Sequence, residues 1–139
     1  MKFDIVLRWL HMTGNLVWIG SILAVGLVIV TKSADAKVRG EIALALYQRL
    51  AAPAFVLSFL GGAVRLFSEP AFYLKQHHWM HAKLPLALGV IALHHVIGAR
   101  AKKLAQGTVQ DPGPTATLSL VLAALAVGAA FFAIFKIPD

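Results

Sequence analysis

The sequence predicts an all-α integral membrane protein, an up-down bundle of four helices that forms a single domain over residues 1–139. Hydrophobic residues make up 59% of the chain and charged residues 14%, whereas roughly 45–50% apolar residues is usual in soluble domains. Four apolar stretches each exceed or approach the roughly 20 helical residues that cross a bilayer core. Because short polar segments connect these stretches, neighbouring helices are expected to run antiparallel.

Each apolar stretch is interpreted as one membrane span. The predicted spans cover residues 5–30, 42–67, 79–99 and 116–137. The first stretch is too long for a cleavable signal peptide and contains Arg8 and His11, so we interpret it as a span. Pro53 is expected to kink the second helix. The fourth has no ionisable residue before Lys136 and is expected to contact lipid or pack against other helices.

The basic residues indicate a membrane partner. The formal net charge is +7, but lysine and arginine gather at the ends of apolar stretches and form no stripe typical of a nucleic-acid interface. Anionic lipid headgroups explain this distribution better. More lysine and arginine follow the first and third spans than lie on the opposite side, so the positive-inside rule predicts two non-cytoplasmic termini. We expect a multi-pass protein of the bacterial inner (cytoplasmic) membrane.

Polar side chains inside the spans are the candidate functional residues, because such groups are costly in hydrocarbon and usually face a partner. His11, Asn15 and Trp18 lie on one stripe of the first helix and are expected to face the bundle interior. Lys83 and His94 are eleven residues apart, which places both on nearly the same helix face. The alternative is that the lysine snorkels to the interface and the histidines cap helix ends.

Helical rise places several of these groups at one depth. His11 and Lys83 lie on spans that run in the same direction, and their depths differ by only about 3 Å. One layer near the non-cytoplasmic side is therefore expected to collect five basic side chains: Arg8, His11, Arg65, His81 and Lys83. Asp4 and Glu69 lie outside the predicted spans, so the layer is expected to lack a carboxylate and to need an anionic ligand.

Haem b meets the requirements of this layer. It is flat and apolar, fits between the helices of a bundle, and carries two propionates that Arg8 and Arg65 could hold. His11 is predicted to be one axial ligand of the iron. Lys83, or His81 in its place, is predicted to be the other; lysine binds iron as the neutral amine, which burial favours.

Three further residues complete the predicted cofactor-binding set: Asn15, Trp18 and His94. For His94, a proton path or a lipid headgroup is an open alternative. The chain has no cysteine, so disulfides, thiolate metal sites and iron–sulfur clusters are excluded. Phosphate-binding glycine loops, nucleophile elbows and paired carboxylates are also absent from the sequence.

The third span carries the motif Trp79-Met80-His81-Ala82-Lys83-Leu84, with His94 following. This motif resembles the Trp-Leu-His-x-Lys-Leu…Tyr-His signature of the HemJ-type protoporphyrinogen IX oxidases. Leu10-His11 with Trp18 is similar to the first-helix histidine and tryptophan of that family. The stretch Gln48-Arg49-Leu50…Pro53-Ala54, with Gly61 after it, is similar to the family's second helix.

The resemblance implies a b-type haem and the oxidation of protoporphyrinogen IX to protoporphyrin IX in haem biosynthesis. It also implies that His11 and Lys83 are the key catalytic residues. A porphyrin and a quinone-type electron acceptor are the expected small-molecule partners. Two family elements have no counterpart here: the Leu-Pro-Arg-Leu-Phe-Val-Tyr-His stretch after the first helix and the Arg-x-x-Asn-Glu-x-Pro element before the last.

Three alternatives remain open. A non-enzymatic haem protein, such as an electron-transfer subunit, carrier or sensor, would bind the same cofactor without turning over a porphyrinogen. A CopD-type copper-handling membrane protein shares the loose pattern and would use imidazole and thioether ligands that copper(I) accepts: His11, Met12, His77, His78, Met80 and His81. The third is a purely structural membrane subunit. In each case, glycine-rich helix faces allow a homo-oligomer.

Overall fold

The computed structural model describes residues 2–32 and 34–137, in which helices and their connections occur but no strand. The helices are, in order, α1 (Lys2–Val30), α2 (Ala36–Leu46), η1 (Tyr47–Ala51), α3 (Ala52–Ser68), η2 (Phe72–Gln76), α4 (Trp79–Ala105) and α5 (Thr115–Phe135). Within these ranges, four helical stretches are long and apolar enough to cross a membrane: 3–30, 36–68, 79–105 and 115–135. The predicted all-α class is confirmed.

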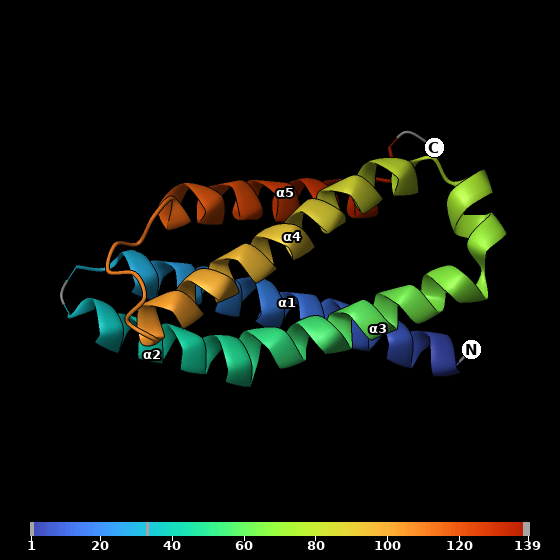
Figure 1. Ribbon diagram of the computed structural model, residues 1–139. Coiled ribbons are helices and arrows are strands. Elements are labelled where there is room, and N and C mark those ends of the chain that lie inside the picture. The colour runs from blue at the N-terminus through green and yellow to red at the C-terminus, as the bar shows by residue number, and fades with distance from the viewer. Residues whose placement is uncertain (1, 33, 138–139) are drawn as a thin grey trace.

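α2, η1 and α3 form one continuous helix with a π-helical turn in its middle (Figure 1). The turn comes directly before Pro53, whose ring has no N–H to donate and crowds the carbonyl one turn earlier. The N–H of Ala52 bonds instead to the carbonyl of Tyr47, five residues back. The disturbance expected at Pro53 is therefore a widened turn, a feature that often occurs at functional sites.

The helices pack in pairs around α1. α3 packs against α1, α5 packs against α4, and α1 also contacts α4 and α5. In Figure 1, α1 and α4 run in one direction while α3 and α5 return, and α3 and α4 diverge toward the start of α4. The larger apolar core, which includes Ile22, Ile29 and Ile97, therefore joins α1, α2 and α4 toward the other end.

Small residues allow the closest helix contacts. A Cβ at Gly14 of α1 would lie 2.7 Å from the backbone N of Ser58 in α3, and a Cβ at Gly40 of α2 would lie 2.2 Å from the backbone N of Ala105. Neither backbone can yield to a side chain at that distance. Glycine at these two positions therefore sets the spacing of α1 from α3 and of α2 from the end of α4.

Charged ends extend two helices beyond the predicted spans. α2 begins at Ala36, where the carboxylate of Asp35 accepts from the N–H of Lys37 at 3.2 Å. Arg39, expected in a polar loop, is only 8% exposed, and its Nη1 donates to the carbonyl of Thr31 at 2.6 Å. α4 continues to Ala105 instead of ending at residue 99. Lysine and arginine favour the helix, so an apolar window underestimates its length.

Candidate functional site

His11 is held on α1 by a hydrogen-bond network with α3. Its Nδ1 lies 2.8 Å from the carbonyl oxygen of Ser58, and because a carbonyl only accepts, Nδ1 carries the proton. Nε2 then keeps its lone pair, and Asn15 Nδ2 lies 3.3 Å away. Ser58 Oγ donates to Asn15 Oδ1 at 2.7 Å and fixes that amide. This is the tautomer that metal-ligating histidines adopt.

Gly62 explains how the imidazole reaches a helix carbonyl. In an α-helix the Ser58 carbonyl bonds to the N–H four residues later, which is that of Gly62, and its second lone pair stays available. A Cβ at Gly62 would lie 2.8 Å from Cε1 of His11. The missing side chain therefore leaves the space that the ring occupies against α3.

Lys83 faces the same region from α4. It is half-buried and lies within electrostatic range of both His11 and Arg65. Its Nζ is 5.8 Å from the ring centroid of Trp79. Three helices thus place His11, Arg65 and Lys83 within electrostatic range of one another.

The expectation that this layer lacks a carboxylate is wrong. α1 begins at Lys2, so Asp4 lies one turn before Arg8 on the same helix. Its Oδ2 is 2.7 Å from Nε of Arg8, and its Oδ1 is 3.0 Å from Nε of Arg65. Arg65 also donates through Nη2 to the hydroxyl of Tyr73 at 2.5 Å. Arg8 and Arg65 are therefore both paired with Asp4. Lys83, by contrast, has no carboxylate within ion-pair distance among residues 2–32 and 34–137.

His81 lies on another side of α4. It is exposed, and its Nε2 donates to the carbonyl of Leu74 at 2.7 Å, which ties α4 to η2. Two residues of α-helix turn about 200°, so His81 and Lys83 project from nearly opposite faces. Its predicted role as a substitute iron ligand would require this hydrogen bond to break.

His94 belongs to a second cluster, deeper along α4. It is fully buried, and Nε1 of Trp18 donates to its Nδ1 at 3.1 Å. Because indole N–H only donates, Nδ1 is the acceptor and the proton of the neutral ring sits on Nε2. That Nε2 is buried and has no hydrogen-bond partner among the described atoms. A protonated Nε2 does not coordinate a metal, so the hydrogen bond distinguishes His94 from His11.

Aromatic rings from two helices surround His94. Tyr47 of η1 stacks on it with ring centroids 4.8 Å apart, and Phe55 of α3 lies 5.1 Å away. These two residues and Ser58 were not anticipated as site residues. Ser58 had a detectable signal, since it is a hydroxyl inside an apolar span, but its partner depended on the register of α3 against α1.

Two of the candidate copper ligands, His11 and Met12, face different directions on α1. Met12 is 70% exposed on α1, while His11 faces α3. Nowhere in the described chain do three or more His, Cys, Asp or Glu side chains form a group that could hold a metal ion. Two axial ligands to haem iron require no such group.

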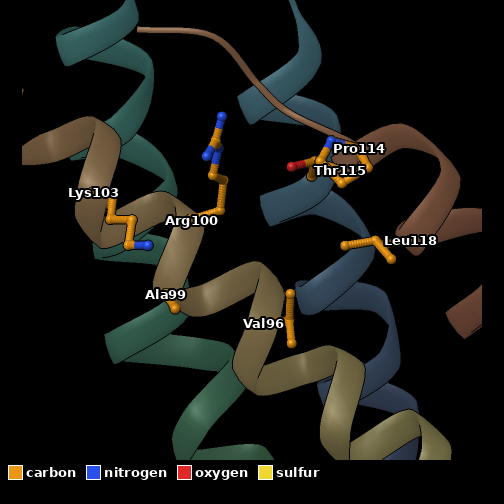
Figure 2. A pocket seen from close by; sticks show the side chains of 7 residues that line it. All are labelled: Val96, Ala99, Arg100, Lys103, Pro114, Thr115 and Leu118. Atoms are coloured by element: carbon orange, nitrogen blue, oxygen red, sulfur yellow. The ribbon is translucent and has the colours of Figure 1, made fainter. Parts of the chain in front are cut away.

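A pocket of about 240 Å³ lies at the opposite end of α4 from Lys83 (Figure 2). It lies between α4 and the start of α5, where Val96 and Leu118 form its apolar side and Arg100 and Lys103 its basic side. No histidine is among the described residues that line it.

None of the family models, curated proteins or solved structures compared with the chain matches it. The functional assignment therefore depends on the residues and the geometry described above.

Proposed function

We propose that this chain is a multi-pass integral membrane protein that binds haem b beside His11 and Lys83 and oxidises protoporphyrinogen IX. The observation that carries the proposal is the hydrogen bond from His11 Nδ1 to the Ser58 carbonyl. It puts the proton on Nδ1 and leaves Nε2 as an acceptor, which takes an N–H of Asn15 and would exchange it for iron when haem binds. The substrate follows from the resemblance of residues 79–84 to the signature of the HemJ-type oxidases.

Membrane insertion is supported by the surface of the helices. Large apolar side chains cover the outside of the molecule, with Leu16 79%, Phe67 77% and Leu120 74% exposed. Continuous apolar surface of this extent is typical of contact with lipid. Basic residues gather where α1, α2, α4 and α5 meet, so we place that end in the bacterial cytoplasm and both termini on the other side.

The donor set includes two side chains that could ligate haem iron. His11 offers an imidazole nitrogen, and the ring is held by a hydrogen bond from Nδ1 to Ser58. Lys83 offers an amine near His11 that forms no ion pair with a carboxylate among the described residues. The propionate contacts fit less directly. Arg8 and Arg65 already share Asp4, so they would hold a propionate only by sharing their charge between two carboxylates.

When bound, haem supplies the one-electron redox chemistry that oxidation of a porphyrinogen needs. The residues of the chain orient and bind. Ser58 and Asn15 fix the plane of the His11 ring. Lys83, in the second turn of α4, contributes a hydrogen-bonding group near His11 and Arg65, and Arg65 attracts the carboxylates of a porphyrin ligand.

Complementation tests the activity. The gene is expressed in a bacterium that lacks its own protoporphyrinogen oxidase, and growth without added haem is measured. We expect the wild-type protein to restore growth and His11→Ala to fail. His78→Gln is the matched control, because His78 is an exposed histidine directly before α4 that has no predicted part in haem binding, and it should restore growth.

The same preparation distinguishes the alternatives. A well-expressed, haem-loaded protein that does not restore growth would contradict the oxidase and favour a non-enzymatic haem protein. Metal analysis of the purified protein that finds copper without iron would contradict haem binding altogether.

A further inference from the structure

We infer that His94, His95, Tyr47 and Phe55 form a second binding site, which takes the flat carbonyl-bearing ring of a lipid-soluble quinone. The inference rests on the membrane insertion proposed above and names the class of electron acceptor. It does not depend on haem being bound at His11.

The first support is a buried donor without an acceptor. His94 is fully buried, and Trp18 occupies its Nδ1, which leaves the proton on Nε2. No described atom accepts from that nitrogen. Buried N–H groups are almost always paired, because leaving one unpaired is unfavourable. The expected partner is a ligand atom that accepts a hydrogen bond.

The second support is an imidazole on the surface beside it. His95 is exposed, and its ring centroid is 4.9 Å from that of His94. Its Nδ1 lies 3.4 Å from the hydroxyl of Tyr47. An imidazole that faces hydrocarbon is costly and usually functional. The pair offers hydrogen-bonding groups from a buried and an exposed position at one point on α4.

Aromatic rings favour a flat ligand at this point. Tyr47 stacks on His94 with an interplanar angle of 28°, and Phe55 makes an edge contact with His95. Tyr47 belongs to the π-helical turn η1, and turns of this kind often accompany functional sites. Gly98 of α4 leaves room for the Tyr47 ring, since a Cβ at Gly98 would lie 2.3 Å from Cε2 of Tyr47.

Depth in the membrane restricts the class of ligand. His94 is about 22 Å along α4 from Trp79 and about 16 Å from Ala105, which places it deep in a hydrocarbon core about 30 Å thick. A ligand reaches this level through lipid, so phosphates and other ions are excluded. A neutral aromatic ring with carbonyl acceptors fits all three observations, and quinones have this chemistry.

Tryptophan fluorescence measures the binding. The purified full-length protein, prepared without haem in nanodiscs of phosphatidylethanolamine and phosphatidylglycerol, is titrated with a short-chain ubiquinone and a short-chain menaquinone. We expect saturable quenching by at least one of them. Trp18→Phe should remove the saturable part of the quenching, because Trp18 contacts His94 directly. Trp9 is exposed on α1 and is quenched only by quinone dissolved in the lipid, which does not saturate, and Trp79 lies about 22 Å along α4 from His94.

Histidine variants locate the site. His95→Leu changes an exposed residue and should leave the fold intact while weakening quinone binding about tenfold, the effect of one lost hydrogen bond. His94→Leu should weaken binding at least as much. His81→Leu is the matched control at the other end of α4 and should bind quinone as the wild type does.

The outcomes separate this inference from the proposed function. Three results would overturn the second site. They are quenching that never saturates, wild-type quinone affinity in His94→Leu and His95→Leu, and displacement of the quinone by protoporphyrin. A protein that binds quinone normally but never acquires a haem spectrum would overturn the proposed function and leave the quinone site standing.

Discussion

Two interior histidines, His11 on α1 and His94 on α4, have opposite hydrogen-bond patterns. His11 donates from Nδ1 to a carbonyl, so its Nε2 keeps a lone pair. His94 accepts at Nδ1 from Trp18, so its Nε2 carries the proton. The first ring is prepared to ligate a metal and the second to donate a hydrogen bond.

The difference arises from what each opposing helix offers. α3 presents a carbonyl to His11, because Gly62 leaves it uncovered. α1 presents an indole N–H to His94 from Trp18. Both partners depend on helix spacing, and α1 contributes to both sites. Residue type alone therefore does not determine the role of a histidine in a membrane span; the group opposite Nδ1 does.

The largest expected effect outside the histidines comes from Lys83. Lys83→Ala should abolish the growth rescue and shift the absorption spectrum of the haem, because the proposed site would lose one of its two candidate iron ligands. Lys75→Ala, at an exposed position in η2, is the control. An unchanged spectrum in Lys83→Ala would place the second ligand elsewhere.

The next effect tests the spacing between α1 and α3. Gly14→Ala should destabilise the protein by about 1–3 kcal/mol, because the new methyl group meets the backbone of Ser58. Gly20→Ala on the same helix meets nothing within 4 Å and should be neutral or slightly stabilising. Thermal unfolding in detergent measures both, and equal melting temperatures would contradict the close contact.

Trp18→Phe tests the tautomer of His94 with a smaller effect. The ring is largely preserved but the N–H to His94 is lost, which should cost about 1 kcal/mol of stability. Haem binding at His11 should be unaffected. A loss of the haem spectrum in Trp18→Phe would show that the two clusters form one site.

The smallest effect lies outside both clusters, at the connection between α4 and α5. The N–H of Gly113 and the charge of Arg100 hold the pKa of Asp111 below its ordinary value of 3.8. A carboxyl whose pKa is lower in the folded than in the unfolded state stabilises the folded state. This contribution is fully present when the pH is above the pKa of the unfolded state. Asp111→Asn should therefore lower the melting temperature at neutral pH, and the difference should vanish as the pH falls through the lowered pKa of the folded state. A constant difference across that range would contradict the ion pair.

The sequence predicted the helical class, the four apolar stretches and the interior stripe of α1, because hydrophobic periodicity and length determine these features. It failed at the ends. Asp4 precedes the predicted start of the first span at residue 5, so it was placed outside the spans, although its spacing of four from Arg8 indicates a helical ion pair. Residues 72–76 were expected in a loop and form the π-helical turn η2.

Contacts between helices were the least predictable part. The pairing of Trp18 with His94 joins residues 76 positions apart and depends on the rotation of two helices. The same is true of Ser58 and His11. Depth along the bundle follows from helical rise alone, so the approach of Lys83 to His11 was accessible from the sequence while the hydrogen-bond partners were not.

A reduced-minus-oxidised absorption spectrum of the purified protein tests the central assignment most directly. We predict a b-type haem signal in the wild type, its loss in His11→Ala, and its retention in His94→Gln, which keeps an acceptor for Trp18. A wild type without haem, or a haem signal that survives His11→Ala and disappears in His94→Gln, would contradict the account.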